Sequence, residues 1–206
     1  MLPNDKEIIV VDDYKCAGYP ASKRNWALKK AKGDIVAFID NDAYPSMDWL
    51  NNALPYLNLD NVVAVCGAGI LPADAPFLEQ ASDLVYRMLP FSYRVIPKKE
   101  RIVKEFPTFN LIVKKKYVDL VGEFKSYLTG EDSLFCWELN KYGKIIYSPY
   151  VIVYHNRRPL FKPFIDQIST YGLHRGHLIR LALLGLITTV IFYGYNFIKG
   201  FFKKKI

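Results

Sequence analysis

Two aspartates separated by one residue, Asp40 and Asp42, carry the clearest chemical signal in the sequence. They follow the apolar run 34–39, which is typical of a buried strand. Residues two apart on an extended chain project to the same side, so we expect the two carboxylates to point together. Converging carboxylates suit a hard divalent cation that keeps open positions for phosphate oxygens. The motif therefore predicts a cation that grips a nucleotide diphosphate, with a solvated Asp-Asn-Asp turn as the alternative interpretation.

Charged residues also follow the first apolar run and open the first expected helix. Asp12 and Asp13 come directly after 7–11, where a carboxylate can accept hydrogen bonds from a base or a ribose. Lys23 and Arg24 lie at a helix start, where free backbone N–H groups favour a phosphate. These residues predict a nucleotide-binding cradle, with a turn and a solvated helix face as the structural alternatives.

Two further titratable residues stand at the ends of expected elements in the second half of the chain. Asp132 opens a helix after Gly130, where its carboxylate can act as a general base. His155 follows the last apolar run, where it can bind a metal ion or a phosphate. The alternatives are a helix-dipole role for Asp132 and a simple hydrogen bond for His155.

Short apolar runs alternate with mixed segments over most of the chain. Continuous Val and Ile runs are typical of strands that are covered on both faces. The alternation predicts an α/β fold with a mixed, mostly parallel sheet flanked by helices, in which strand ends build the site. The stretch 67–107 contains five prolines and is expected to form helical turns and loops rather than sheet. The expected strands are 7–11, 34–39, 62–66, 109–113, 144–147 and 151–154, and the expected helices are 21–32, 46–57 (with Ser46 as N-cap) and 131–142.

Positive charge is concentrated in the C-terminal quarter of the chain. Residues 1–150 carry 19 Lys and Arg against 19 Asp and Glu, whereas residues 151–206 carry 9 against one. A neutral domain with a basic, apolar tail favours a membrane surface over nucleic acid. The segment 159–180 has apolar residues at helical spacing among basic ones, as in an interfacial helix. The run 181–198 has no charged residue and would reach ~27 Å as a helix, which predicts a transmembrane span, with a buried or re-entrant helix as the alternative.

Taken in order, these motifs resemble family 2 glycosyltransferases of the GT-A (Rossmann-like) fold over about residues 7–177. The basic stretch 157–163, with Gln167 and 171–175, is similar to the membrane-associated members. The resemblance implies a nucleotide-sugar donor, a Mg²⁺ or Mn²⁺ ion and inversion at the anomeric carbon. The stretches that match are 7–13, 23–25, 31–45, 49–50, 110–114, 121–122, 130–132 and 153–155.

The resemblance also implies roles for individual residues. Asp132 would be the catalytic base that deprotonates the acceptor hydroxyl. The residues implied in donor binding are Asp12, Asp13, Lys23, Arg24 and Asp40, and those implied at the metal are Asp40, Asp42 and His155. A further expectation places Glu131, Asn110, Lys98, Lys99 and Arg101 on the acceptor side, with a solvated loop as the alternative for Lys98, Lys99 and Arg101.

Two departures from the family pattern bear on the domain organisation. The usual first apolar strand is not found before Glu7, and the link from Asp13 to Lys23 is short. We therefore expect residues 1–158 to form an N-terminally incomplete catalytic domain. The interfacial segment 159–180 would follow it, and then a transmembrane helix with a basic tail over 181–206.

The resemblance thus implies an inverting, metal-dependent enzyme, which we expect to add a sugar to a lipid-linked or polysaccharide acceptor. The Q-x-x-R-W pattern of processive members is absent, which favours transfer of a single sugar. The enzyme is expected at a membrane, with its catalytic domain on the cytoplasmic side and no nucleic-acid partner. Two alternatives stay open. One is an inactive remnant that binds nucleotide or a membrane partner, and the other is a phosphoacceptor receiver domain, suggested by Asp12, Asp13 and Asp40.

Overall fold

The computed structural model describes residues 6–88, 98–125, 130–170 and 172. The chain divides into two compact units, 1–165 and 166–206, and the fold and site below belong to the first, which runs past the boundary we expected at residue 158. The expected transmembrane segment 181–206 and the last part of the expected interfacial segment lie outside the described residues. Within the described ranges, no helix has the length and the hydropathy needed to cross a bilayer.

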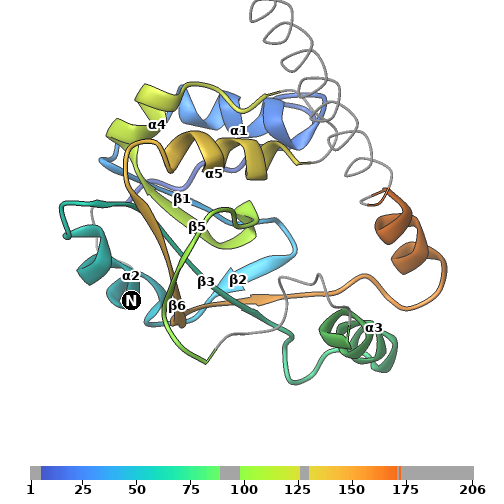
Figure 1. The fold of residues 1–206 in the computed structure, drawn as a ribbon. Coiled ribbons are helices and arrows are strands. Elements are labelled where there is room, and N and C mark those ends of the chain that lie inside the picture. The colour runs from blue at the N-terminus through green and yellow to red at the C-terminus, as the bar shows by residue number, and fades with distance from the viewer. Residues whose placement is uncertain (1–5, 89–97, 126–129, 171, 173–206) are drawn as a thin grey trace, which may run out of the picture. The chain divides into compact units, whose positions relative to one another are not determined.

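A mixed sheet forms the centre of the first unit (Figure 1). Its strands are ordered β1-β5-β3-β6-β2, and β4 pairs with the first half of β6. Strand β6 is the longest and contacts β3, β2 and β4, so it joins most of the sheet. The strands are β1 (Ile35–Phe38), β2 (Ala43–Pro45), β3 (Val62–Ile70), β4 (Arg101–Val103), β5 (Leu111–Lys114) and β6 (Lys144–His155).

The expectation of a mostly parallel sheet is wrong for the described strands. Only β3 and β6 run parallel, and the pairs β1–β5, β3–β5, β2–β6 and β4–β6 are antiparallel. A continuous apolar run indicates a strand that is covered on both faces, whether its neighbours run parallel or antiparallel to it. Strands β3 and β5 are mostly buried as expected, whereas β1, from the run 34–39, leaves Ile35 and Ala37 exposed. The sequence pattern contained no information on strand direction.

Helices cover both faces of the sheet, and each face has its own hydrophobic core. In Figure 1, α1, α4 and α5 lie together on one side and α2 lies on the other. Alternate residues of β5 serve the two cores: Leu111 and Val113 face the first, and Ile112 faces the second. The helices are α1 (Pro20–Leu28), α2 (Trp49–Leu57), α3 (Phe77–Met88), α4 (Lys115–Val121) and α5 (Glu131–Leu139), with a short 3₁₀ turn, η1 (Thr108–Asn110), before β5.

The first expected strand, 7–11, is not a strand in this structure. Ile8 and Val10 are exposed, and a strand needs a neighbour to pair its N–H and C=O groups. The two expected strands at the C-terminal end, 144–147 and 151–154, are instead the single strand β6.

Other elements differ from the expectation mainly at their ends. Helix α1 ends at Leu28, earlier than expected, and α2 begins at Trp49 without a side-chain cap from Ser46. Pro55 lies inside α2 and does not end it. The stretch 67–107, expected to contain no sheet, holds the end of β3 and all of β4 as well as α3.

A bulge separates the two halves of the β3–β6 pairing. Gly67 lies opposite Ser148, whereas Gly69 lies opposite Val153, so β6 spans more residues than β3 between these positions. A Cβ added at Gly67 would lie 1.9 Å from the carbonyl oxygen of Val151. Only glycine permits this close approach, after which β6 continues toward β2.

The Gly67→Ala variant should therefore lose about 3 kcal/mol of unfolding free energy, because the added methyl group must push the two central strands apart. Gly33→Ala is the matched control, since its Cβ would meet no atom closer than 3.5 Å and should cost less than about 1 kcal/mol. Urea unfolding followed by circular dichroism measures both. Equal stabilities of the two variants would contradict the close packing at the bulge.

Candidate active site

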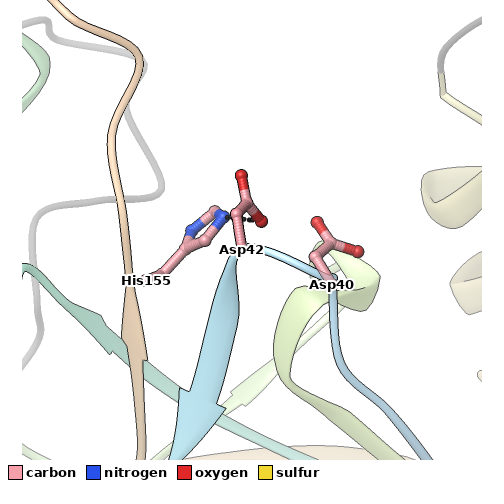
Figure 2. A group of neighbouring side chains, drawn as sticks. All are labelled: Asp40, Asp42 and His155. Atoms are coloured by element: carbon pink, nitrogen blue, oxygen red, sulfur yellow. Dashed lines mark hydrogen bonds and ion pairs between the residues drawn. The ribbon is translucent and has the colours of Figure 1, made fainter.

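Asp40, Asp42 and His155 gather at one end of the sheet (Figure 2). The chain between the two aspartates is a turn rather than an extended strand, because the Ala43 N–H donates to the Asp40 carbonyl over 3.1 Å. The convergence that we predicted is therefore present, but its predicted cause is wrong. The turn, and not the two-residue period of a strand, brings the carboxylates to the same side.

Pairing of β2 with β6 places His155 beside the turn. Ala43 is in register with His155, and the Asn156 N–H donates to the Asp42 carbonyl over 3.1 Å. The His155 ring stacks on Phe109 with centroids 4.9 Å apart, and its Nε2 lies 3.1 Å from Oδ1 of Asp42.

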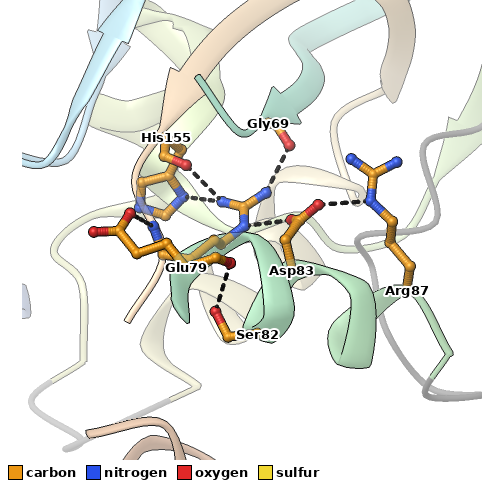
Figure 3. A network of polar contacts seen from close by, with 7 residues as sticks. Gly69, Glu79, Ser82, Asp83, Arg87 and His155 are labelled. Atoms are coloured by element: carbon orange, nitrogen blue, oxygen red, sulfur yellow. Dashed lines mark hydrogen bonds and ion pairs between the residues drawn. The ribbon is translucent and has the colours of Figure 1, made fainter. Parts of the chain in front are cut away.

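Arg157 determines which ring nitrogen of His155 carries the proton. Its guanidinium lies 3.0 Å from Nδ1 of His155, and a guanidinium can only donate (Figure 3). Nδ1 must therefore accept, so the ring proton sits on Nε2 and is donated to Asp42. In this arrangement His155 orients the Asp42 carboxylate. Nε2 of His155 could bind a cation only after it loses this proton.

The donor set fits a divalent cation. Ligand atoms of Asp40, Asp42 and His155 lie within 4.8 Å of one another, and both aspartate side chains are about half exposed. Carboxylate oxygens with open positions beside them suit Mg²⁺ or Mn²⁺ and leave room for phosphate oxygens. The hydrogen bond from His155 lowers the pKa of Asp42, whereas burial raises the pKa of Asp40 despite the nearby charge of Arg24.

Arg24 connects this group to a second pair of acids. Its guanidinium lies 2.6 Å from Oε1 of Glu131 and 3.7 Å from Oδ1 of Asp40. Arg24 lies on α1, Glu131 lies on α5, and Asp40 precedes the turn before β2. Asn25 fixes α1 by exchanging two hydrogen bonds with the Phe124 backbone, at 2.9 and 2.8 Å.

Asp132 lies in the first turn of α5, next to Glu131. The turn is entered through Gly130, whose φ of 87° is a conformation that favours glycine. Burial, followed by the charge of Glu131, raises the pKa of Asp132 to about 6. A carboxylate with this pKa can accept a proton near neutral pH. Asp132 thus follows Glu131, the residue that Arg24 joins to Asp40.

The expected nucleotide-side residues lie around the start of α1. Asp12 accepts a hydrogen bond from the Lys15 N–H over 3.0 Å, which fixes a turn. Asp13 is exposed and pairs with Lys23 over 2.7 Å. The structure thus brings Asp13 and Lys23 together, beside the helix that carries Arg24.

The structure does not place the expected acceptor-side residues as predicted. The Asn110 amide is fully buried, donating to the Ala68 and Val151 carbonyls and accepting from the Trp49 indole N–H at 3.2, 2.8 and 2.9 Å. Such a side chain supports the core and cannot reach an acceptor. The Glu131 side chain is also buried, in its ion pair with Arg24.

The expected basic acceptor residues lie on another part of the sheet. Arg101 is on β4, opposite Tyr147 in the first half of β6, and Lys98 and Lys99 precede that strand. His155, by contrast, ends the second half of β6. Lys98 and Lys99 lie in an exposed loop, as in the alternative interpretation. The Arg101 guanidinium lies over the Tyr147 ring, 5.7 Å from the ring centroid.

Sequence reasoning missed the buried ion pair behind His155. The side chain of Arg157 donates to Asp83 of α3 over 2.7 Å and to the Gly69 carbonyl over 2.8 Å. Asp83 belongs to no motif and lies far from Arg157 in the sequence, so no local signal pointed to this pair.

A sheet that ends in a cation-ready pair of carboxylates, faced by a candidate base from a neighbouring helix, is typical of enzymes that use nucleotide-diphosphate donors. The family model "Glycosyl transferase family 2" matches residues 17–121, and the chain belongs to this family of glycosyltransferases. The matched part contains Lys23, Arg24, Asp40 and Asp42. Membership of this family leaves no support for the receiver-domain alternative.

Two curated relatives are similar to the chain. It is 29% identical over 163 residues to "Pre-mycofactocin glycosyltransferase" of Mycobacterium tuberculosis, covering 74% of this chain and 33% of the relative. It is 25% identical over 189 residues to "Glycosyltransferase AglE" of Haloferax volcanii, covering 86% of this chain and 59% of the relative. The chain thus spans between about a third and three fifths of the length of these relatives.

Solved structures with partial likeness include S. aureus TarS in complex with UDP-GlcNAc, with 20% identity, a TM-score of 0.48 and coverage of 71% of this chain and 41% of that one. Another is GalNAc-T7 with UDP, GalNAc and Mn²⁺, with 12% identity, a TM-score of 0.49 and coverage of 66% and 30%. Both TM-scores are below 0.5, too low to define the fold of this chain.

Replacing Asp132 by Asn should stabilise the protein at pH 8 by about 1 kcal/mol, because it removes a buried charge. The folded-state pKa of about 6 lies above the ordinary value of an aspartate, so ionisation of Asp132 costs stability as the pH rises from that ordinary value to about 6. The gain should therefore disappear at low pH, where the carboxyl group is protonated in both states.

Urea unfolding at several pH values measures this effect. Asp119→Asn is the control, because Asp119 is exposed on α4 and pairs only with Lys115 among the interactions described for it. It should show no such gain. A Asp132→Asn variant that is less stable than the wild type at pH 8 would contradict the buried, charged state of Asp132.

Proposed function

We propose that this chain is the catalytic part of an inverting, metal-dependent glycosyltransferase that moves a single sugar from a nucleotide sugar. The observation that supports this most is the position of Arg24, which contacts both Asp40 and Glu131. Because Asp132 follows Glu131, this contact would bring the candidate base close to the candidate cation-binding group. Membership of glycosyl transferase family 2 supports the reaction type.

The donor diphosphate would lie between the turn of Asp40 and Asp42 and the start of α1. Asp40 and Asp42 would hold Mg²⁺ or Mn²⁺, with His155 beside them. The bound ion would offset the negative charge that develops on the departing diphosphate. Lys23 and the positive end of the α1 helix dipole favour phosphate there, and Asp12 and Asp13 would contact the nucleoside.

Asp132 would take the proton of the acceptor hydroxyl. The acceptor oxygen then bonds to the anomeric carbon, the bond from that carbon to the diphosphate oxygen breaks, and the nucleoside diphosphate leaves with the electron pair. Because the acceptor attacks the face opposite the leaving group, the anomeric configuration inverts. Arg24 keeps Glu131 paired, which prevents a second free carboxylate beside the base.

The proposed acceptor is lipid-linked or a polysaccharide, reached at the cytoplasmic side of a membrane. The basic composition of residues 151–206 supports a membrane partner. The short link between Asp13 and Lys23 keeps the inactive remnant as the second candidate function.

The full chain, supplied with membranes as the source of acceptor, Mn²⁺ and a panel of nucleotide sugars, should release nucleoside diphosphate. The rate should rise with pH through about 6, because Asp132 accepts a proton only when ionised. Asp132→Asn should lower the rate by about 10²–10⁴-fold, whereas Asp119→Asn should leave it unchanged. Phosphate-coupled detection of the released diphosphate gives the measurement.

Two outcomes would contradict the proposal. If the Asp132→Asn variant kept the wild-type rate and pH profile, Asp132 would not be the catalytic base. Absence of release from every donor, together with intact nucleotide binding, would favour the remnant.

A further inference from the structure

Helix α3 buries its polar side and exposes its apolar side, the reverse of an ordinary surface helix. Ser82 and Asp83 face inward and are buried, while Phe77, Leu84 and Met88 are exposed. Large exposed apolar residues that lie together on a protein surface mark a contact with a partner or a membrane.

The buried side of α3 is held by Arg157 (Figure 3). The guanidinium donates to Asp83 over 2.7 Å, and the Arg157 N–H donates to Glu79 over 3.1 Å. Asp83 also accepts from Arg87 over 2.6 Å, and these two hydrogen bonds lower the pKa of Asp83 although burial raises it. This network fixes the rotation of α3, so its apolar side must point outward.

The exposed side of α3 forms one stripe. Phe77, Leu84 and Met88 are 79%, 61% and 75% exposed. They are separated by seven and eleven residues, close to two and three helical turns, so they lie on the same side of the helix.

The segment after Arg157 extends this stripe. The Leu160 N–H donates to the Leu78 carbonyl over 3.0 Å, which places 160–165 beside the start of α3. Phe161 has a φ of 79°, a conformation that is unfavourable for a bulky residue, and its side chain is 64% exposed. Strain of this kind persists where the surrounding structure holds it. The α3 face is defined here as Phe77, Leu78, Leu84, Met88, Phe161 and Ile165, all of them exposed.

We propose that the α3 face docks on the surface of a lipid bilayer that contains anionic lipids. Exposed Arg158 and Lys162 flank Phe161, and an apolar stripe bordered by cations matches a headgroup layer above acyl chains. The sequence continues into a strongly basic region with the uncharged run 181–198, whose composition suits the same partner.

Docking in this way would hold the candidate active site near the membrane. Arg157 contacts both Asp83 of α3 and His155, and His155 contacts Asp42. A lipid-linked acceptor would then reach the site from the bilayer. This last step rests on the proposed function, whereas docking itself does not.

The test attaches an environment-sensitive fluorophore to Leu84→Cys in the full chain. Cys16→Ser removes the one native thiol that is partly exposed, since Cys66 and Cys136 are buried. Leu120→Cys on α4 is the matched control, because Leu120 is also an exposed leucine on a helix. Each protein is mixed with phosphatidylcholine vesicles, with or without phosphatidylglycerol, that carry a spin-labelled lipid quencher.

The proposal predicts a blue shift and quenching at position 84 but not at position 120, with a larger effect when phosphatidylglycerol is present. Equal signals at the two positions would overturn it. A blue shift at position 84 before vesicles are added would also overturn it. If that shift grows with protein concentration, a second copy covers the face, and if it does not, another segment of the same chain does.

A second variant measures the contribution of the face to binding. Phe77→Gln, Leu84→Gln and Met88→Gln together should weaken vesicle co-sedimentation by about tenfold or more. Nucleotide binding should be unchanged, so failure of docking and failure of the proposed catalysis give different results. Unchanged co-sedimentation of this triple variant would contradict the proposal.

Discussion

The candidate site depends on the close grouping of four carboxylates at one end of the sheet. Asp40 and Asp42 come from one turn, and Glu131 and Asp132 come from the start of α5. Arg24 contacts Asp40 and Glu131, and His155 contacts Asp42. Burial raises the pKa of Asp40 and of Asp132, so each carboxylate is costly to ionise. A divalent cation would offset the cost of ionising Asp40. Asp132, with a pKa of about 6, can exchange a proton near neutral pH.

Contacts between distant parts of the chain hold these carboxylates in place. The β3–β6 bulge at Gly67 lets β6 continue to β2, which sets His155 beside Asp42. On the other side, hydrogen bonds between Asn25 and Phe124 fix α1, so that Arg24 meets α5. The network around Arg157 orients His155 from behind and holds α3 with its apolar side outward. The same residue thus links the candidate cation site to the proposed membrane face.

The grouping of Asp40, Asp42 and His155 could be predicted from residue types and their order, because Asp40 follows β1 and His155 ends β6. The same reasoning failed for Asp12 and Asp13, which follow an apolar run that forms no strand. Strand direction could not be predicted, since coverage on both faces gives the same apolar pattern in parallel and antiparallel pairs. The structural role of Asn110 was missed because the sequence does not distinguish a buried, fully hydrogen-bonded amide from an exposed one. Asp83 and Arg157 were missed as a pair because their contact is tertiary and has no local period. The expected strand at 7–11 was wrong because an apolar run does not by itself supply a pairing neighbour.

The central claim is that Asp40 and Asp42 hold a divalent cation against a donor diphosphate. The most direct measurement is titration of Mn²⁺, with and without a nucleoside diphosphate, followed by the electron paramagnetic resonance signal of the free ion. The account predicts that the diphosphate strengthens Mn²⁺ binding in the wild type and in Asp119→Asn, and that Asp42→Asn loses this effect. Identical Mn²⁺ binding in Asp42→Asn and the wild type, with the diphosphate present, would contradict it.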